Sequence, residues 1–142
     1  MQKLESVQLG TVYMGRLSYN SDLLDSLNEL CREQGVTLGR IEAIGAVQRA
    51  KLEYYDQHTR QYQFFSLDQG LEIANLMGNI SVKEGRPMVH AHITLADANG
   101  RTFGGHLAQG CPVFACEYIL QAFNGPEFVR SYDEQTGLPL WS

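Results

Sequence analysis

Cysteine, long apolar runs and blocks of positive charge are all scarce in this sequence. Its three cysteines, Cys31, Cys111 and Cys116, form no CxxC pair, and their odd number favours reduced thiols over a disulfide framework. No apolar run approaches the roughly 20 residues of a membrane span. The first residues, Met1 to Glu5, lack the apolar core of a signal peptide. These absences predict a cytoplasmic protein that does not enter a membrane.

Negative charge outweighs positive charge. The 11 Lys and Arg residues are scattered singly and face 16 Asp and Glu residues, so the net charge at pH 7 is −5. Nucleic acids and anionic membranes recruit Lys and Arg, and this balance therefore works against non-specific binding to either. The 142 residues, 44% of them hydrophobic, fit one globular domain over residues 1–142 that needs neither a disulfide nor a metal merely to fold.

One helix is expected over residues 22–34. The turn at residues 18–21 can supply its N-cap, and Gly35 suits the position after its C-terminal end. We expect Cys31 to lie in the core beneath this helix. The apolar residues that recur at helical spacing are Leu23, Leu24, Leu27, Leu30 and Cys31.

The rest of the chain is typical of short strands joined by turns. Tyrosines and phenylalanines flank a turn at residues 56–60, which predicts a hairpin whose aromatic side chains pack as a sheet face. An aromatic platform for nucleic acid is the alternative, but no basic groove accompanies it. Apolar and β-branched residues mark further strands near residues 7–17, 36–49, 88–96, 101–107 and 128–132.

Three segments have weaker patterns. Residues 72–82 and 111–123 are apolar, but periodicity does not decide between strand and helix for either of them. The tail, residues 133–142, is expected to be irregular, with Trp141 docked on the domain rather than free. One helix among many short strands predicts an α+β fold with a largely antiparallel (mixed) sheet.

Three of the four histidines gather in one region, His90 and His92 on an expected strand and His106 on the next. Alternate residues of a strand share a face, so the first two imidazoles project together, roughly 7 Å apart along the strand. Three histidines on adjacent strands are a partial zinc shell with a fourth position open. The alternative is that all three are satisfied by hydrogen bonds to backbone and neighbours. His58 lies in a polar turn, where we expect it to be exposed.

The hairpin that carries these histidines poses a problem of register. A four-residue turn at residues 97–100 places His106 opposite Ala91, which faces away from the other two histidines. A bulge or an odd-length loop restores the shared face. We expect a bulge at Gly104-Gly105, because glycine tolerates positive φ, and a regular hairpin at that pair would count against the site.

Several stretches together resemble the plants-and-prokaryotes-conserved (PPC) domain family, which also supplies the globular part of plant AT-hook nuclear proteins. The resemblance runs from about residue 7 to residue 132 and is carried by Gly45-Ala46-Val47, Leu52 to Asp56, Glu72 to Ile80, Val89-His90-Ala91-His92, and Asp97 to Gly100 with Gly104 to Leu107. It implies an α+β fold, strands at residues 72–82 and 111–123, and a homotrimer. It also implies a metal, typically zinc, at His90, His92 and His106. The chain has no Arg-Gly-Arg-Pro hook.

Three functional hypotheses follow. The first is a zinc-binding homotrimer that binds a small-molecule ligand or a partner. The second is a zinc-dependent hydrolase or lyase that uses water bound to a three-histidine zinc. Glu117 is the first candidate for its general base, with an ion-paired or rim carboxylate as the alternative role for this residue. The third, a DNA-associated regulator, rests on family analogy and is disfavoured by the acidic charge and the missing hook.

Overall fold

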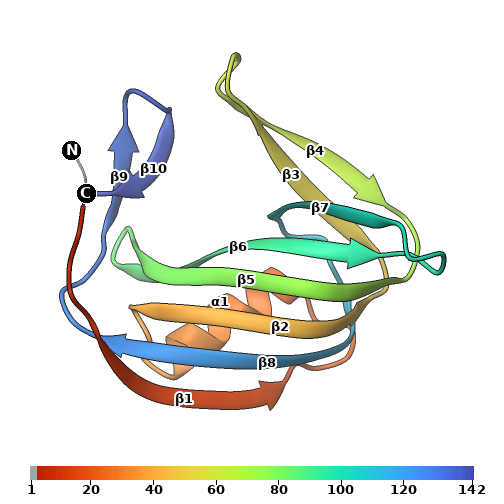
Figure 1. The fold of residues 1–142 in the computed structure, drawn as a ribbon, viewed down its shortest axis with the longest axis horizontal. Helices are drawn as coiled ribbons and strands as arrows, with labels where there is room; N and C mark the ends of the chain where they lie inside the picture. Colours follow the sequence, from red (N-terminus) through yellow and green to blue (C-terminus); the bar gives the residue numbers. More distant parts are fainter. Residues whose placement is uncertain (1–2) are drawn as a thin grey trace.

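The computed structural model describes residues 3–142, which form one large antiparallel sheet, one helix and a small hairpin (Figure 1). The helix is α1 (Leu23–Glu33). The strands are β1 (Gln8–Arg16), β2 (Gly39–Val47), β3 (Ala50–Asp56), β4 (Gln61–Leu67), β5 (Leu71–Lys83), β6 (Arg86–Ala96), β7 (Thr102–Leu107), β8 (Val113–Asn124), β9 (Arg130–Asp133) and β10 (Leu138–Trp141). The first eight form the sheet in the order β1-β8-β2-β5-β6-β7-β3-β4, and every pairing between neighbours is antiparallel. The expected α+β class is confirmed.

Helix α1 packs behind the sheet in the view of Figure 1 and forms the core with it. Leu23, Leu27 and Cys31 recur every four residues and are fully buried, as their spacing predicted. Asp22, and not the turn before it, caps the helix: its Oδ1 accepts a hydrogen bond from the Asp25 N–H at 3.1 Å. No helix within residues 3–142 is long and apolar enough to cross a membrane.

The central strands alternate between the helix side and the open side of the sheet. Val89, Ala91 and Ile93 on β6 are buried against the helix side, at 3%, 2% and 2% exposure. The residues between them, His90 and His92, therefore project from the opposite side, which we call the outer face.

Bulges explain the two segments whose pattern was ambiguous, and both are strands, β5 and β8. The pairing of β5 with β6 shifts between Ile73 and Asn75, so the buried positions lose their two-residue period. The facing shift in β2 falls at Gly45, whose φ is +146° and where a Cβ would meet the Ala115 carbonyl oxygen at 2.1 Å. Only glycine fits this close approach of β2 to β8.

The tail is not irregular: β9 and β10 form a hairpin that stands at the end of β5 and β6 (Figure 1). Its turn is closed by Asp133, whose Oδ2 accepts hydrogen bonds from the backbone N–H and the hydroxyl of Thr136. Trp141 docks edge-on against Phe128 with ring centroids 4.8 Å apart, as its position near the end suggested. Strands of four residues, one of them containing a proline, are too short to show a period.

Candidate metal centre

The β6–β7 hairpin brings His106 directly opposite His92. The register is regular from this pair to the last one, Ala96 with Thr102, so the bulge expected at Gly104-Gly105 is absent. The loop has an odd length instead, residues 97–101, with the Asp97 N–H donating to the Arg101 carbonyl at 2.9 Å. Loop length, the other device that restores the shared face, therefore aligns the histidines.

Asp97 holds that loop in shape. Its Oδ1 accepts hydrogen bonds from the N–H groups of Asn99 and Arg101 at 2.8 and 3.0 Å, and its Oδ2 accepts from Arg101 Nε at 2.8 Å. Burial alone would raise the pKa of Asp97, but these hydrogen bonds and the guanidinium charge outweigh it and lower the pKa below its ordinary value. The ionised carboxylate is thus part of the loop structure that sets the register.

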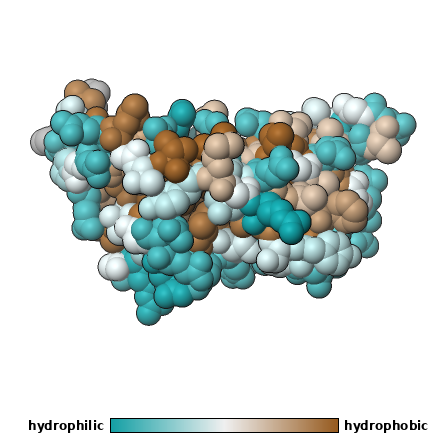
Figure 2. Space-filling model, turned by 90° about the horizontal axis from the view of Figure 1, so that it is seen from below, coloured by the Kyte–Doolittle hydropathy of each residue, from teal (hydrophilic) through white to brown (hydrophobic). Residues whose placement is uncertain are grey.

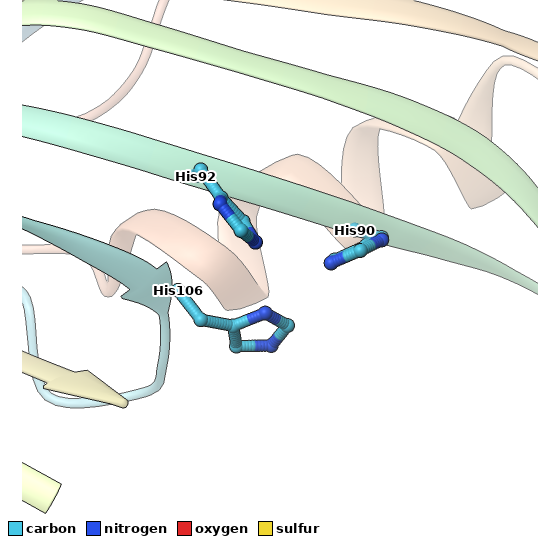
Figure 3. A group of neighbouring side chains, drawn as sticks. All are labelled: His90, His92 and His106. Atoms are coloured by element: carbon cyan, nitrogen blue, oxygen red, sulfur yellow. The ribbon is translucent and has the colours of Figure 1, made fainter. Parts of the chain in front are cut away.

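The three imidazoles converge over β6 and β7 (Figure 3). One ligand nitrogen from each of His90, His92 and His106 lies within 4.8 Å of the other two. The ring centroids are 5.3 Å apart for the pair on β6, and those rings lie 4.9 and 5.5 Å from the ring of His106. The structure brings together all three residues that the sequence singled out, whereas His58 is exposed in its turn.

His90 and His106 have the protonation state that a metal requires. Burial lowers the pKa of His90 to about 4, and the neighbouring His106, Arg130 and His92 lower it further. Burial also lowers the pKa of His106 to about 4, with His92 and Arg130 adding to the effect. Both rings are neutral at pH 7, so their lone pairs are free, and a nitrogen-rich set of this kind suits Zn²⁺.

The buried cysteines do not compete for this role. Cys31, Cys111 and Cys116 are unpaired and lie in the core on the helix side of the sheet. Burial raises the pKa of the Cys31 thiol to about 12 and that of the Cys116 thiol to about 11. Protonated, enclosed thiols of this kind are inert, in agreement with the core position expected for Cys31.

A carboxylate that the sequence did not single out, Glu53, borders the histidines. It lies on β3 opposite His106, and its Oε2 is 3.6 Å from His106 Nε2. Burial raises the pKa of Glu53, an effect that Lys51 partly opposes. Because His106 is neutral at pH 7, this contact is not an ion pair. Gly105 permits it, since a Cβ there would meet the Glu53 carbonyl oxygen at 3.1 Å and hold β7 away from β3.

Glu117, the carboxylate proposed from the sequence, lies elsewhere. It projects from β8, where it is paired with Ile44 of β2, and strands β2 and β5 separate it from β6. It lines a different hollow of about 710 Å³ on the outer face, together with Met14 and Ile119. Within one chain the structure therefore does not bring Glu117 to the histidines. Proximity in sequence misled here, because β8 returns to the far side of the sheet.

The histidines lie in a cavity of about 860 Å³ between the β3–β4 hairpin and the β9–β10 hairpin. These two hairpins rise on either side of β6 and β7 in Figure 1. Tyr55 Oη donates to the Thr136 carbonyl at 2.7 Å and Arg60 Nη1 to the Glu134 carbonyl at 3.1 Å, so the hairpin tips are joined. Arg130, from β9, also lines the cavity. The C-terminal segment, whose residues 133–142 were expected to be irregular, thus supplies one wall of the cavity.

The fold and the site define a small α+β domain with a three-histidine centre on the outer face of its sheet. The profile of the Plants and Prokaryotes Conserved (PCC) domain matches residues 4–124, and the chain belongs to this family. This match agrees with the resemblance carried by the sequence motifs.

Solved structures share the whole architecture. A metal-containing protein of Archaeoglobus fulgidus is 39% identical, with a TM-score of 0.94 and 99% of each chain covered. A plant- and prokaryote-conserved (PPC) protein of Pyrococcus horikoshii is 32% identical, with a TM-score of 0.93 and coverage of 99% of this chain and 97% of that one. A protein of Bacteroides thetaiotaomicron, described as a candidate DNA-binding protein, is 25% identical, with a TM-score of 0.86 and 96% of each chain covered.

The chain is also similar to part of a much longer curated protein. It is 36% identical over 129 residues to the bifunctional protein GlmU of Synechococcus sp. (strain JA-2-3B'a(2-13)). The match takes in 89% of this chain but only 19% of that relative's length. The similarity therefore concerns one domain of a larger protein.

Proposed function

We propose that this protein binds Zn²⁺ through His90, His92 and His106 and uses the centre to bind a small molecule or a partner. The observation that carries this proposal is the convergence of three ligand nitrogens within 4.8 Å. Burial, by keeping two of the rings neutral, supports it. The description of the Archaeoglobus relative as metal-containing agrees with it. A zinc ion held by three imidazoles keeps a coordination position for an external ligand and lowers the pKa of a bound water towards ~7.

Elemental analysis of protein purified without chelator tests the centre. We expect about one metal ion per chain in the wild type, the stoichiometry of a single three-histidine site. His90→Ala and His106→Ala should each lose nearly all of it, while His58→Ala, which removes an exposed imidazole outside the cluster, should retain it. Equal metal content in all four proteins would overturn the proposal.

We also propose that the domain works as a homotrimer. Strands β1, β8, β2 and β5 carry large hydrophobic side chains on the outer face that a single chain leaves exposed, and we call this set the apolar half. Figure 2 looks at the β1 edge and shows such residues, in brown, at the surface. Met14, Ile44 and Ile119 line one hollow of this face, and exposed apolar surface of this kind marks an interaction site. The members of the apolar half are Met14 (76% exposed), Ile119 (39%), Ile44 (58%) and Met77 (58%).

A metal-dependent hydrolase or lyase is the second candidate function, and Glu53 favours it. Its Oε2 is 3.6 Å from His106 Nε2, and burial raises the pKa of this carboxyl. A raised pKa brings a carboxylate nearer to the range in which it both accepts and returns a proton. In this candidate function Glu53, and not Glu117, holds the proton.

DNA binding is the third hypothesis. The Bacteroides relative is described as a candidate DNA-binding protein, but the net charge of this chain is −5, which works against contacts with phosphates. Titration with duplex DNA at physiological salt tests the idea, and tight binding would revive it.

The three unpaired cysteines support a cytoplasmic location.

A further inference from the structure

Arg130 is held beside the histidines by neutral groups alone. Its Nε donates to Ser81 Oγ at 2.8 Å, and its Nη1 donates to the Pro139 carbonyl at 3.0 Å. Its Nη2 donates to Asn79 Oδ1 at 2.8 Å and lies 3.4 Å from His90 Nδ1. Serine, amide and carbonyl oxygens position the guanidinium without neutralising it.

No carboxylate of residues 3–142 compensates this charge within 4.0 Å. The guanidinium is partly withdrawn from water by the cavity, and burial lowers its pKa from the ordinary value. A charged group removed from water is costly unless it is paired. A negative charge on Tyr62 would favour the charged guanidinium. Burial raises the pKa of Tyr62, however, so this side chain carries no negative charge at pH 7. The site therefore keeps one unpaired positive charge.

A divalent cation on the histidines would deepen this imbalance. Arg130 already lies against one of the three rings, and like charges repel strongly in a site with little water. Glu53 supplies one negative charge, which is insufficient against a divalent ion and a guanidinium together. A small anion bound between the histidines and Arg130 relieves the repulsion and accepts hydrogen bonds from guanidinium N–H groups that Ser81, Pro139 and Asn79 do not use.

Gln57 and Lys83 also line the cavity, but the wall beside Arg130 is apolar and indicates what the anion carries. Leu138 and Leu140 of β10 and Met88 of β6 line the cavity next to Arg130, with Tyr54 on the facing hairpin. Ligand sites commonly combine such an apolar lining with a few convergent polar groups. The volume of about 860 Å³ accommodates a small organic molecule rather than an inorganic ion alone.

We propose that Arg130 is the anion-binding residue of this cavity, and that the ligand is a small organic carboxylate. Its carboxylate lies between Arg130 and the histidines, and its apolar part lies against the β9–β10 hairpin. This inference rests on the proposed function only for the metal ion that lies beside the bound carboxylate. The positive charge of Arg130 attracts the anion whether or not the metal is present. Arg130 lies in the strand expected near residues 128–132, but nothing in the sequence indicated that this strand approaches the histidines, and Arg130 falls outside the profile match of residues 4–124.

Calorimetric titration with benzoate, and with neutral benzamide of the same shape, tests the inference on both zinc-loaded and metal-free protein. We expect Arg130→Gln to weaken benzoate binding about tenfold or more, the order expected for lost hydrogen bonds to a charged group, and to leave benzamide unchanged. Arg49→Gln, which removes an exposed arginine between β2 and β3, is the matched control and should bind benzoate as the wild type does. Inorganic phosphate should bind less tightly than benzoate, and equal or tighter phosphate binding would overturn the assignment to an organic carboxylate.

The single tryptophan, Trp141, reports whether the hairpin stays docked, since Arg130 Cζ lies 5.7 Å from its ring centroid. Arg130→Lys keeps the charge and should retain a preference for benzoate over benzamide even if the glutamine variant loosens the hairpin. Arg130-dependent benzoate binding to protein that takes up no metal would support this inference while the metal proposal fails. Equal benzoate affinity in wild type and Arg130→Gln, or no preference for benzoate in Arg130→Lys, would overturn the inference while leaving the metal centre intact.

Discussion

The outer face of the sheet has two halves that differ in chemistry although they belong to one continuous sheet. The histidine half, on β6, β7 and β3, faces a cavity walled by two hairpins. The apolar half, on β1, β8, β2 and β5, has no such walls within one chain. A single cross-strand row runs through both halves. In order it contains Met14, Ile119, Glu42, Met77, His92, His106 and Glu53.

This contrast shows how one architecture serves two purposes. Strand alternation gives both halves the same orientation, away from α1, so their difference comes only from side-chain chemistry and from what covers them. The imidazoles of His90 and His106 are desolvated by their own chain, which keeps these two rings neutral at pH 7. Methionine and isoleucine in the apolar half are exposed in the single chain, and the proposed trimer would cover them. The two halves should therefore respond separately to change.

Shortening the β6–β7 loop should disrupt the histidine half and leave the apolar half intact, and this is the largest effect that we expect. Deletion of Asn99 leaves one residue too few for the five-residue loop. If the loop keeps its length, Thr102 is drawn into it and His106 moves opposite Ile93, on the helix side of the sheet. We expect the metal content to fall close to zero, because one ligand is turned away from the other two, while the oligomeric mass stays unchanged. Asn99→Ala, which keeps the loop length, should bind metal normally. Full metal content together with an unchanged His92–His106 pairing in a structure of the variant would show that loop length does not set the register.

A charge introduced into the apolar half should abolish the trimer and leave metal binding intact. Ile44→Glu introduces a carboxylate at a side chain that is 58% exposed in one chain, and its burial in a trimer would be costly. Light scattering should show the wild type at three times the 15.9 kDa chain mass and the variant at the chain mass, with metal content retained. Tyr132→Glu, on the exposed β9 position, should remain trimeric. A trimeric Ile44→Glu variant would exclude this half as the interface.

Glu53→Gln probes the border of the histidine half. Groups that flank a metal ligand commonly contribute 10–100-fold in metal affinity or activity, so we expect about tenfold weaker zinc binding. Hydrolysis of p-nitrophenyl acetate at saturating zinc should also fall if Glu53 holds the proton. Glu117→Gln is the matched control from the apolar half and should leave both quantities unchanged. Loss of activity only in the Glu117 variant would return the role to that residue.

The smallest expected effect is the pH dependence of stability that comes from Asp97, the carboxylate of the β6–β7 loop. The pKa of Asp97 is lowered in the folded protein, so its ionisation stabilises the fold above its ordinary pKa, near 4, and this contribution is lost as the pH falls below that value. Asp97→Asn should melt a few degrees below the wild type at pH 7. Melting curves of the two proteins should converge as the pH falls below about 4. A constant difference at all pH values would show that the charge is irrelevant.

Local pattern in the sequence was enough for one helix, most strands and the three histidines. The spacing of Leu23, Leu27 and Cys31 specified the buried face of α1, and the alternation of His90 and His92 with Ala91 put both imidazoles on one side. These are short-range properties of a helix or a strand, determined by periods of 3.6 and 2.0 residues. They do not depend on where the rest of the chain lies.

Pairing between distant segments determined everything else about the site. The five-residue loop aligned His106 with His92, the sheet order put Glu53 beside them and Glu117 two strands away, and a short hairpin at the C-terminal end delivered Arg130. Bulges at Gly45 and opposite it disguised β5, because the register shift breaks the two-residue period. Cross-strand neighbours are set by loop lengths, bulges and strand order, none of which has a local sequence period. For that reason the three histidines were predictable from the sequence, while their surroundings emerged only from the tertiary structure.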